Sequence, residues 1–166
     1  EDRLRQGAVH KLSVRHNITL SCLTQINRFF IKSKVEKQYC QKEIEDMSIS
    51  LANDDALIGT LSGGNQQKVI IGKWLLAHPK ILIMDEPTRG IDVGAKAEIH
   101  KLLCKLAQQG MGIILISSEM PEVMGMSDRL IVVHDGHLEY ECDRENFPSQ
   151  EVIMSYAFGI NKSNEN

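Results

Sequence analysis

Residues 61–68 read Leu61-Ser62-Gly63-Gly64-Asn65-Gln66-Gln67-Lys68 and open a helical pattern that continues to about Ala77. Ser62 is a favourable N-cap residue, and the two glycines behind it let the backbone come close to a large group. A helix N-terminus without bulky side chains attracts anions, because its N–H groups and the positive end of the helix dipole point the same way. This stretch therefore predicts a phosphate-binding tip.

A second informative stretch, residues 81–84, is apolar throughout and predicts a strand buried on both faces. It ends in Asp85 and Glu86, at the edge where open α/β sheets bind their ligands. An acid at this position can hold Mg²⁺, and the next can orient a water molecule for attack on a phosphoryl group.

The sequence LSGGNQQK at 61–68, ILIMDEP at 81–87 and TRGID at 88–92 resemble, in order and spacing, the signature, Walker B and D-loop of ATP-binding cassette (ABC) proteins. The Gln-rich signature and SSEMPE at 117–122 are most similar to the second cassette of the ATP-binding subunit of bacterial monosaccharide importers of the ribose and galactose type. The resemblance runs from Glu1 to about Gly159. It implies a partial P-loop NTPase (ABC-type) α/β fold, with a helical subdomain and a mainly parallel sheet core.

The resemblance also assigns roles to single residues. Asp85 would hold Mg²⁺, Glu86 would be catalytic, and Ser118 stands where this fold usually carries its switch histidine. ATP held by a partner cassette would be contacted by residues of the signature and D-loop: Ser62, Gly63, Gly64, Gln66 and Asp92. ATP and Mg²⁺ are thus the expected cofactors of the complete subunit.

A phosphate loop of the form G-x-x-x-x-G-K-[ST] is not found in the 166 residues. The pair Gly72-Lys73 has Gln67 in place of the first glycine and Trp74 in place of the hydroxyl residue. We expect the strand that carries this loop to be missing, and these residues alone to bind ATP weakly and not to hydrolyse it. Whether the chain by itself is an enzyme stays open.

The implied partners are the N-terminal cassette of the same subunit, the transmembrane permease subunits and, indirectly, a periplasmic sugar-binding protein. The implied location is the inner face of the bacterial plasma membrane. Two alternatives stay open: an ABC ATPase without a transport role, and a non-enzymatic remnant or binding module of a truncated ABC ATPase. The net charge of -3 and the scattered basic residues argue against a nucleic-acid partner.

Composition indicates one ordinary globular domain, with 42% hydrophobic and 25% charged residues. We expect three parts: a helical subdomain at 1–77, an α/β core at 78–143, and a C-terminal helix with a polar tail at 144–166. The four cysteines form no CxxC pair, which predicts buried free thiols. Trp74 is predicted to lie in the core.

Periodicity predicts the remaining elements. An apolar helical spacing at 12–42 includes Leu20, Leu23, Ile26, Phe29 and Phe30. Further helices are expected at 36–47, 95–109, 121–126 and 149–157, and a strand at 111–116. Asp135-Gly136 predicts a type I′ turn between strands at 129–133 and 138–142, and the histidines beside that turn are interpreted as hairpin residues and not as metal ligands.

Overall fold

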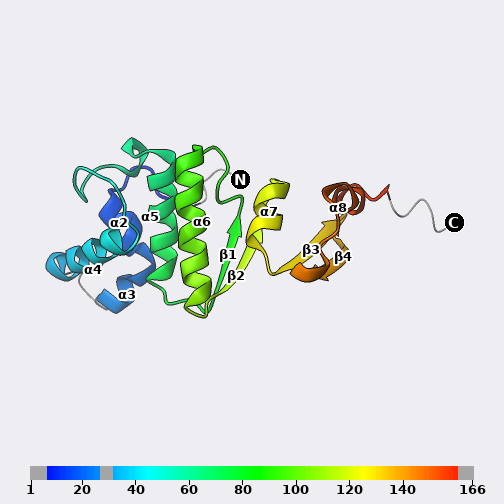
Figure 1. Cartoon of the computed structure of the whole chain (residues 1–166). Helices are drawn as coiled ribbons and strands as arrows, with labels where there is room; N and C mark the ends of the chain where they lie inside the picture. The colour runs from blue at the N-terminus through cyan, green and yellow to red at the C-terminus, as the bar shows by residue number, and fades with distance from the viewer. Residues whose placement is uncertain (1–6, 27–31, 161–166) are drawn as a thin grey trace. The chain divides into compact units, whose positions relative to one another are not determined.

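The structure is a computed structural model that describes residues 7–26 and 32–160. The chain divides into two units, Glu1–Ile114 and Leu115–Asn166, each with its own packed interior (Figure 1). The three-part division at residues 77 and 143 stays a prediction.

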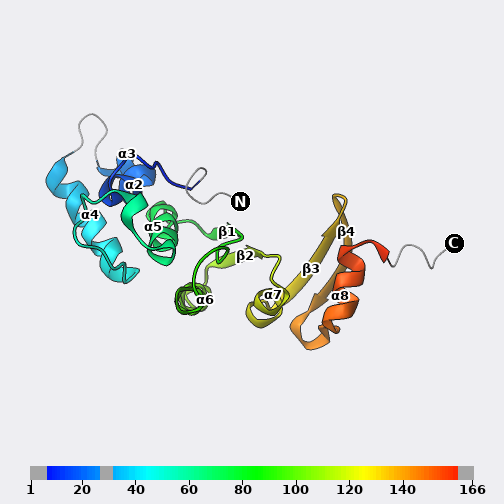
Figure 2. The same cartoon turned by 90° about the horizontal axis from the view of Figure 1, so that it is seen from above.

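The first unit contains most of the helices. They are α2 (Val14–Thr19), α3 (Leu23–Ile26), α4 (Ser33–Asp46), α5 (Gly63–Leu75) and α6 (Val93–Gln108), with 3-10 turns η1 (Leu20–Cys22) and η2 (Ile58–Thr60). Strand β1 (Ile81–Asp85) lies in this unit, and β2 (Gly112–Ile116) begins in it. α2 contacts both α4 and α5, and α5 contacts α6 (Figure 2).

β1 and β2 are neighbours in a two-stranded sheet, and α6 connects them. A helix between two adjacent strands is the crossover that a parallel pair requires. Gly110, with a φ of 91°, follows the helix at the predicted stop. The α/β pattern predicted for residues 81–116 is confirmed.

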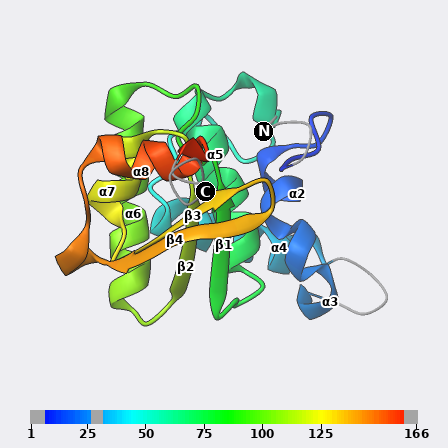
Figure 3. The ribbon, with the colours of Figure 1, turned by 90° about the vertical axis from the view of Figure 1, so that its right-hand side faces the viewer.

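The second unit is a hairpin covered by a helix. β3 (Arg129–His134) pairs antiparallel with β4 (His137–Asp143), α7 (Met120–Met126) precedes them, and η3 (Arg144–Asn146) and α8 (Gln150–Ala157) follow (Figure 3). Leu130, Val132 and Ile153 form the buried centre. Asp135 and Gly136 both have positive φ, 48° and 78°, as the predicted type I′ turn requires.

The strands are less buried than predicted. β1 alternates, with Leu82 and Met84 buried but Ile81 60% and Ile83 65% exposed. Ile114 on β2 is 49% exposed. An apolar run favours burial on two faces, but α5 and α6 lie on one side of β1, so in the described part of the first unit only that face is covered (Figures 1 and 2).

Trp74 is not a core residue, since half of its surface is exposed. Its neighbour Lys73 takes the inward position: the side chain is 7% exposed and its Nζ donates to the Gly7 carbonyl at 2.6 Å. The ammonium group also lies 4.5 Å from the centroid of the Trp74 ring. The burial of Lys73 lowers its pKa.

Two other expectations fail in part. The helical spacing at 12–42 is interrupted by η1 and is not one helix, Leu20 is 41% exposed, and Phe29 and Phe30 lie outside the described residues. All four cysteines are free thiols, but only Cys22 and Cys40 are buried, while Cys104 on α6 is exposed. Burial raises the pKa of the Cys40 thiol to about 12, which makes it inert.

Candidate functional site

The predicted phosphate-binding tip is the first turn of α5. Ser62 is its N-cap in an extended conformation, with φ -61° and ψ 156°, and its Oγ accepts from the Asn65 backbone N–H at 3.5 Å. Ser62 itself is exposed to solvent. The tip is therefore accessible, as a surface that meets an external ligand must be.

The two signature glycines have different surroundings. A Cβ added to Gly64 would stand 2.5 Å from the Cβ of Ala95 on α6, which is closer than two carbon atoms can approach. Gly64 is buried in this helix contact, whereas Gly63 is only half-buried. The need for glycine at position 64 thus comes from packing between α5 and α6, besides any approach of a ligand.

Gln66, predicted to contact nucleotide, turns inward. Its side chain is 8% exposed, and its Nε2 donates to the Leu61 carbonyl at 2.9 Å. This hydrogen bond holds the side chain against the backbone of the residue that precedes Ser62. In the structure Gln66 supports the tip and does not extend from it.

Asp92, the predicted D-loop residue, begins the neighbouring helix. It is the N-cap of α6, with Oδ1 accepting from the Ala95 N–H at 2.9 Å. Gly64 on α5 lies against Ala95 on α6, and one turn further along both helices Lys68 forms a 2.7 Å ion pair with Glu98. The two helices therefore run in the same direction, with their first turns side by side. The structure therefore brings the signature tip and the D-loop cap to one edge of the first unit.

Asp85 and Glu86 lie at the carboxyl end of β1, as predicted. Asp85 is exposed and Glu86 is half-buried. Glu86 has a φ of 49°, in the left-handed region that residues other than glycine rarely adopt. Such backbone geometry concentrates at functional sites and costs about 1–3 kcal/mol.

Ser118, predicted at the switch position, follows β2 and is exposed. It belongs to the second unit, whereas Asp85 and Glu86 belong to the first. The placement of these three residues relative to one another therefore stays a prediction.

Asn65 was not predicted as a site residue. Its Nδ2 donates to Ser62 Oγ at 3.0 Å, and its Oδ1 accepts from the Ser50 N–H at 2.9 Å. Its place three residues after the N-cap is the position from which capping-box side chains reach back, so the spacing was a usable signal.

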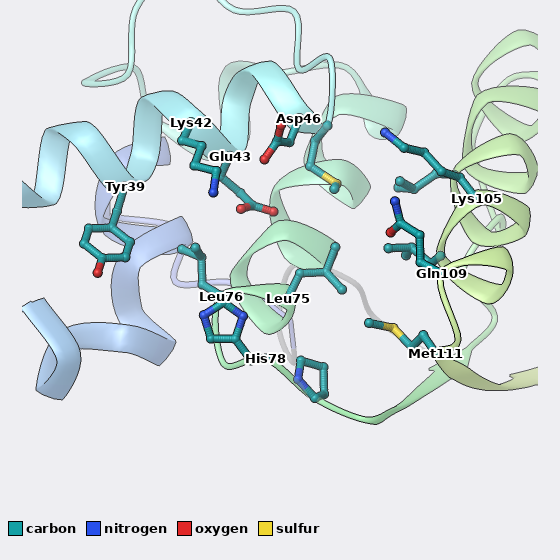
Figure 4. Close-up of a pocket in the computed structure, with 14 residues that line it drawn as sticks. Tyr39, Lys42, Glu43, Asp46, Leu75, Leu76, His78, Lys105, Gln109 and Met111 are labelled. Carbon is teal, nitrogen blue, oxygen red and sulfur yellow. The ribbon is translucent and has the colours of Figure 1, made fainter.

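A groove of about 630 Å³ lies between α4, the end of α5 and α6, away from all predicted site residues (Figure 4). Glu43 points into it and is 6% exposed; its Cγ would stand 2.9 Å from a Cβ at Gly72. Burial, assisted by Asp46 and opposed by Lys42, raises the pKa of Glu43 to about 7. The groove holds none of the acids predicted for catalysis.

Residues 7–26 and 32–160 lack two further features. No helix in these ranges is long and apolar enough to cross a membrane. The same residues contain no cluster of three or more histidine, cysteine or acidic side chains arranged to bind a metal.

The crossover sheet, the signature tip and the acids after β1 define the α/β fold of P-loop NTPases. The family model described as "ABC transporter" matches residues 4–89, just over half of the 166 residues, and the chain belongs to this family. The dimeric structure of the ATP-binding cassette MJ0796 in a post-hydrolysis state bound to ADP and Pi superposes with a TM-score of 0.71. That match covers 86% of this chain and 62% of the other at 23% identity, and so shows the fold alone.

More similar relatives have names that mention sugar import. The chain is 50% identical over 162 residues to the ribose import ATP-binding protein RbsA of Oceanobacillus iheyensis, covering 97% of this chain and 32% of the relative. It is 48% identical over 159 residues to the xylose import ATP-binding protein XylG of Histophilus somni, covering 95% and 31%. The resemblance to ATP-binding subunits of monosaccharide importers is confirmed, and the chain spans about a third of the length of these relatives.

Proposed function

We propose that the chain is the C-terminal portion of the ATP-binding subunit of an ABC-type carbohydrate importer, and that it supplies its signature in trans to ATP held by the partner cassette. The observation that carries this proposal is the exposed Ser62 at the tip of α5, beside the cap of α6. The identity to ribose and xylose import proteins supports the substrate class.

In this proposal the tip of α5 acts by electrostatics. The Ser62 hydroxyl and the positive end of the helix dipole face the terminal phosphate and stabilise charge that develops there. The contact forms only when two cassettes close on the nucleotide, so binding of ATP is coupled to movement of the permease subunits. The subunit would then lie at the inner face of the plasma membrane, and the periplasmic sugar-binding protein would act on it indirectly.

The acids after β1 suit a hard cation, because carboxylate oxygens are the ligands that Mg²⁺ prefers. Asp85 would hold Mg²⁺, and Glu86, with Ser118 in the switch position, would orient water. These roles need the triphosphate that a phosphate loop holds, and residues 1–166 contain no such loop. We infer that residues 1–166 alone bind ATP weakly and do not turn it over. Calorimetric titration with ATP and Mg²⁺ should therefore give no stoichiometric binding isotherm.

The test of the trans role is Ser62→Arg in the complete subunit. A long cation at the tip replaces the hydroxyl and blocks closure over the nucleotide, so ATP-driven sugar uptake should be abolished while expression is unchanged. Unchanged uptake would contradict the assignment. Two results together would favour the alternative, a non-enzymatic binding module of a truncated ABC ATPase. They are the absence of uptake without any substitution and the presence in the cell of an intact chain of this length.

A further inference from the structure

We propose that Asn65 is a positioning residue that makes the Ser62 hydroxyl an obligatory hydrogen-bond donor toward the anion at the tip of α5. The inference rests on the function proposed above and deepens it. Asn65 does not touch the ligand in this account; it acts through Ser62.

The first step is the orientation of the Asn65 amide. The Ser50 backbone N–H lies 2.9 Å from one end of it, and a backbone N–H can only donate. That end must therefore be the acceptor Oδ1. The opposite end is the NH₂ group, 3.0 Å from Ser62 Oγ, and an amide NH₂ can only donate.

The second step follows at Ser62. A serine hydroxyl has two acceptor lone pairs and one proton. Its Oγ accepts from the Asn65 Nδ2 at 3.0 Å and from the Asn65 backbone N–H at 3.5 Å. With both lone pairs directed to Asn65, the proton is left to point away from the helix. An anion is the partner that such a proton favours.

The third step is the anchoring of the loop that sets the amide. Lys68, 7% exposed, donates from Nζ to the Ser48 carbonyl at 2.9 Å and pairs with Glu98 on α6 at 2.7 Å. The segment that carries the Ser50 N–H is thereby tied to α5 and α6 together. Orientation of the hydroxyl is thus built into the packing before any ligand arrives.

The solvent exposure of the three side chains fits their proposed roles in binding and positioning. Ser62 is exposed, Asn65 is half-buried, and Lys68 is buried. A residue that acts on the ligand should be accessible, and those that orient it should be progressively less so.

The experiment measures ATP turnover and sugar uptake of the complete import complex with Ser62→Ala, Asn65→Ala, both together, and Asn65→Asp. The Asp side chain has nearly the same shape but accepts from both Ser50 and Ser62, so it turns the hydroxyl proton inward. We expect each single substitution to lower turnover at saturating ATP about ten- to hundredfold, the size expected for one hydrogen bond to a charged group. The thermal midpoint of Asn65→Asp should stay close to that of the unchanged protein. Asn53→Ala, at an exposed asparagine in a loop, is the matched control for the turnover measurements.

The decisive reading is the double variant. If Asn65 acts through the hydroxyl, Asn65→Ala should add no further loss once Ser62 is alanine. Equal losses in both backgrounds would make Asn65 merely structural and overturn the inference. Loss with Ser62→Ala but not with either Asn65 variant would overturn the inference and leave the proposed function standing, whereas no loss with Ser62→Ala would overturn the proposed function as well.

Discussion

Position 64 requires glycine because Ala95 on α6 lies directly against it. Because an added Cβ would stand 2.5 Å from the Cβ of Ala95, Gly64→Ala should push the helices apart and lower the free energy of unfolding by about 1–3 kcal/mol. Urea denaturation measures this. Gly59→Ala, where no atom lies within 4 Å of the added Cβ, should change the free energy of unfolding little. Ala95→Gly, introduced together with Gly64→Ala, should restore part of the lost stability. Equal effects at both glycines would refute the packing explanation.

Glu43 should make stability depend on pH. Its pKa is raised from 4.5 to about 7, so the folded chain holds this proton more tightly than the unfolded chain. The resulting stability is fully present below about pH 4.5 and is lost as the pH rises through about 7. Glu43→Gln should therefore raise the free energy of unfolding at pH 8 by about 1–3 kcal/mol and have little effect at pH 4.5.

The control for this pH dependence lies on the same helix. Glu45 is exposed, so Glu45→Gln makes the same chemical change outside the buried site and is the matched control. The explanation fails if both variants give the same profile in urea denaturation from pH 4.5 to 8.

At the scale of elements, α6 depends on its N-cap. The Asp92 carboxylate accepts the Ala95 N–H at 2.9 Å, so Asp92→Ala should cost about 1 kcal/mol of stability. Asp92→Asn keeps a capping oxygen and should cost much less. If thermal denaturation shows the two variants equally unstable, the carboxylate charge and not the cap is responsible.

Most elements could be predicted from the sequence because their ends carry local signals. Ser62 and Asp92 cap the helices, Gly110 ends α6, and Asp135-Gly136 closes the hairpin. The acids after β1 and the signature tip were predictable for the same reason. The three-part domain division and the roles of the site residues stay predictions.

Burial was harder to predict because it depends on partners far away in sequence. An apolar run such as residues 81–84 does not say how many faces are covered, and nothing beside Trp74 in sequence shows that Lys73 would take the inward position. The role of Gly64 as a packing residue depends on Ala95, 31 positions further along the chain. The orientation of the Asn65 amide depends on its hydrogen bond from the Ser50 N–H, 15 positions earlier, which no local pattern reveals.

At the scale of the whole molecule, exposed isoleucines should govern association. Ile81, Ile83 and Ile114 on β1 and β2 are each about half exposed or more. Apolar side chains grouped on a sheet promote contacts between molecules. We expect residues 1–166 in isolation to scatter light as particles heavier than 18.7 kDa.

Ile83→Lys should reduce this association, because a charge on the sheet face opposes burial. Val93→Lys, at an exposed position on α6 outside the sheet, is the control and should not. Particles of 18.7 kDa at all concentrations, before any substitution, would contradict the expectation.

Trp74 offers a practical opportunity. It is the chain's single tryptophan, half in water, on the helix whose other end is the signature. Its emission is therefore a built-in optical reporter, which requires no dye and no engineered label. Any protein that covers this side of α5 should shift the fluorescence toward the blue and shield it from acrylamide, so that assembly can be followed in real time with the unmodified chain.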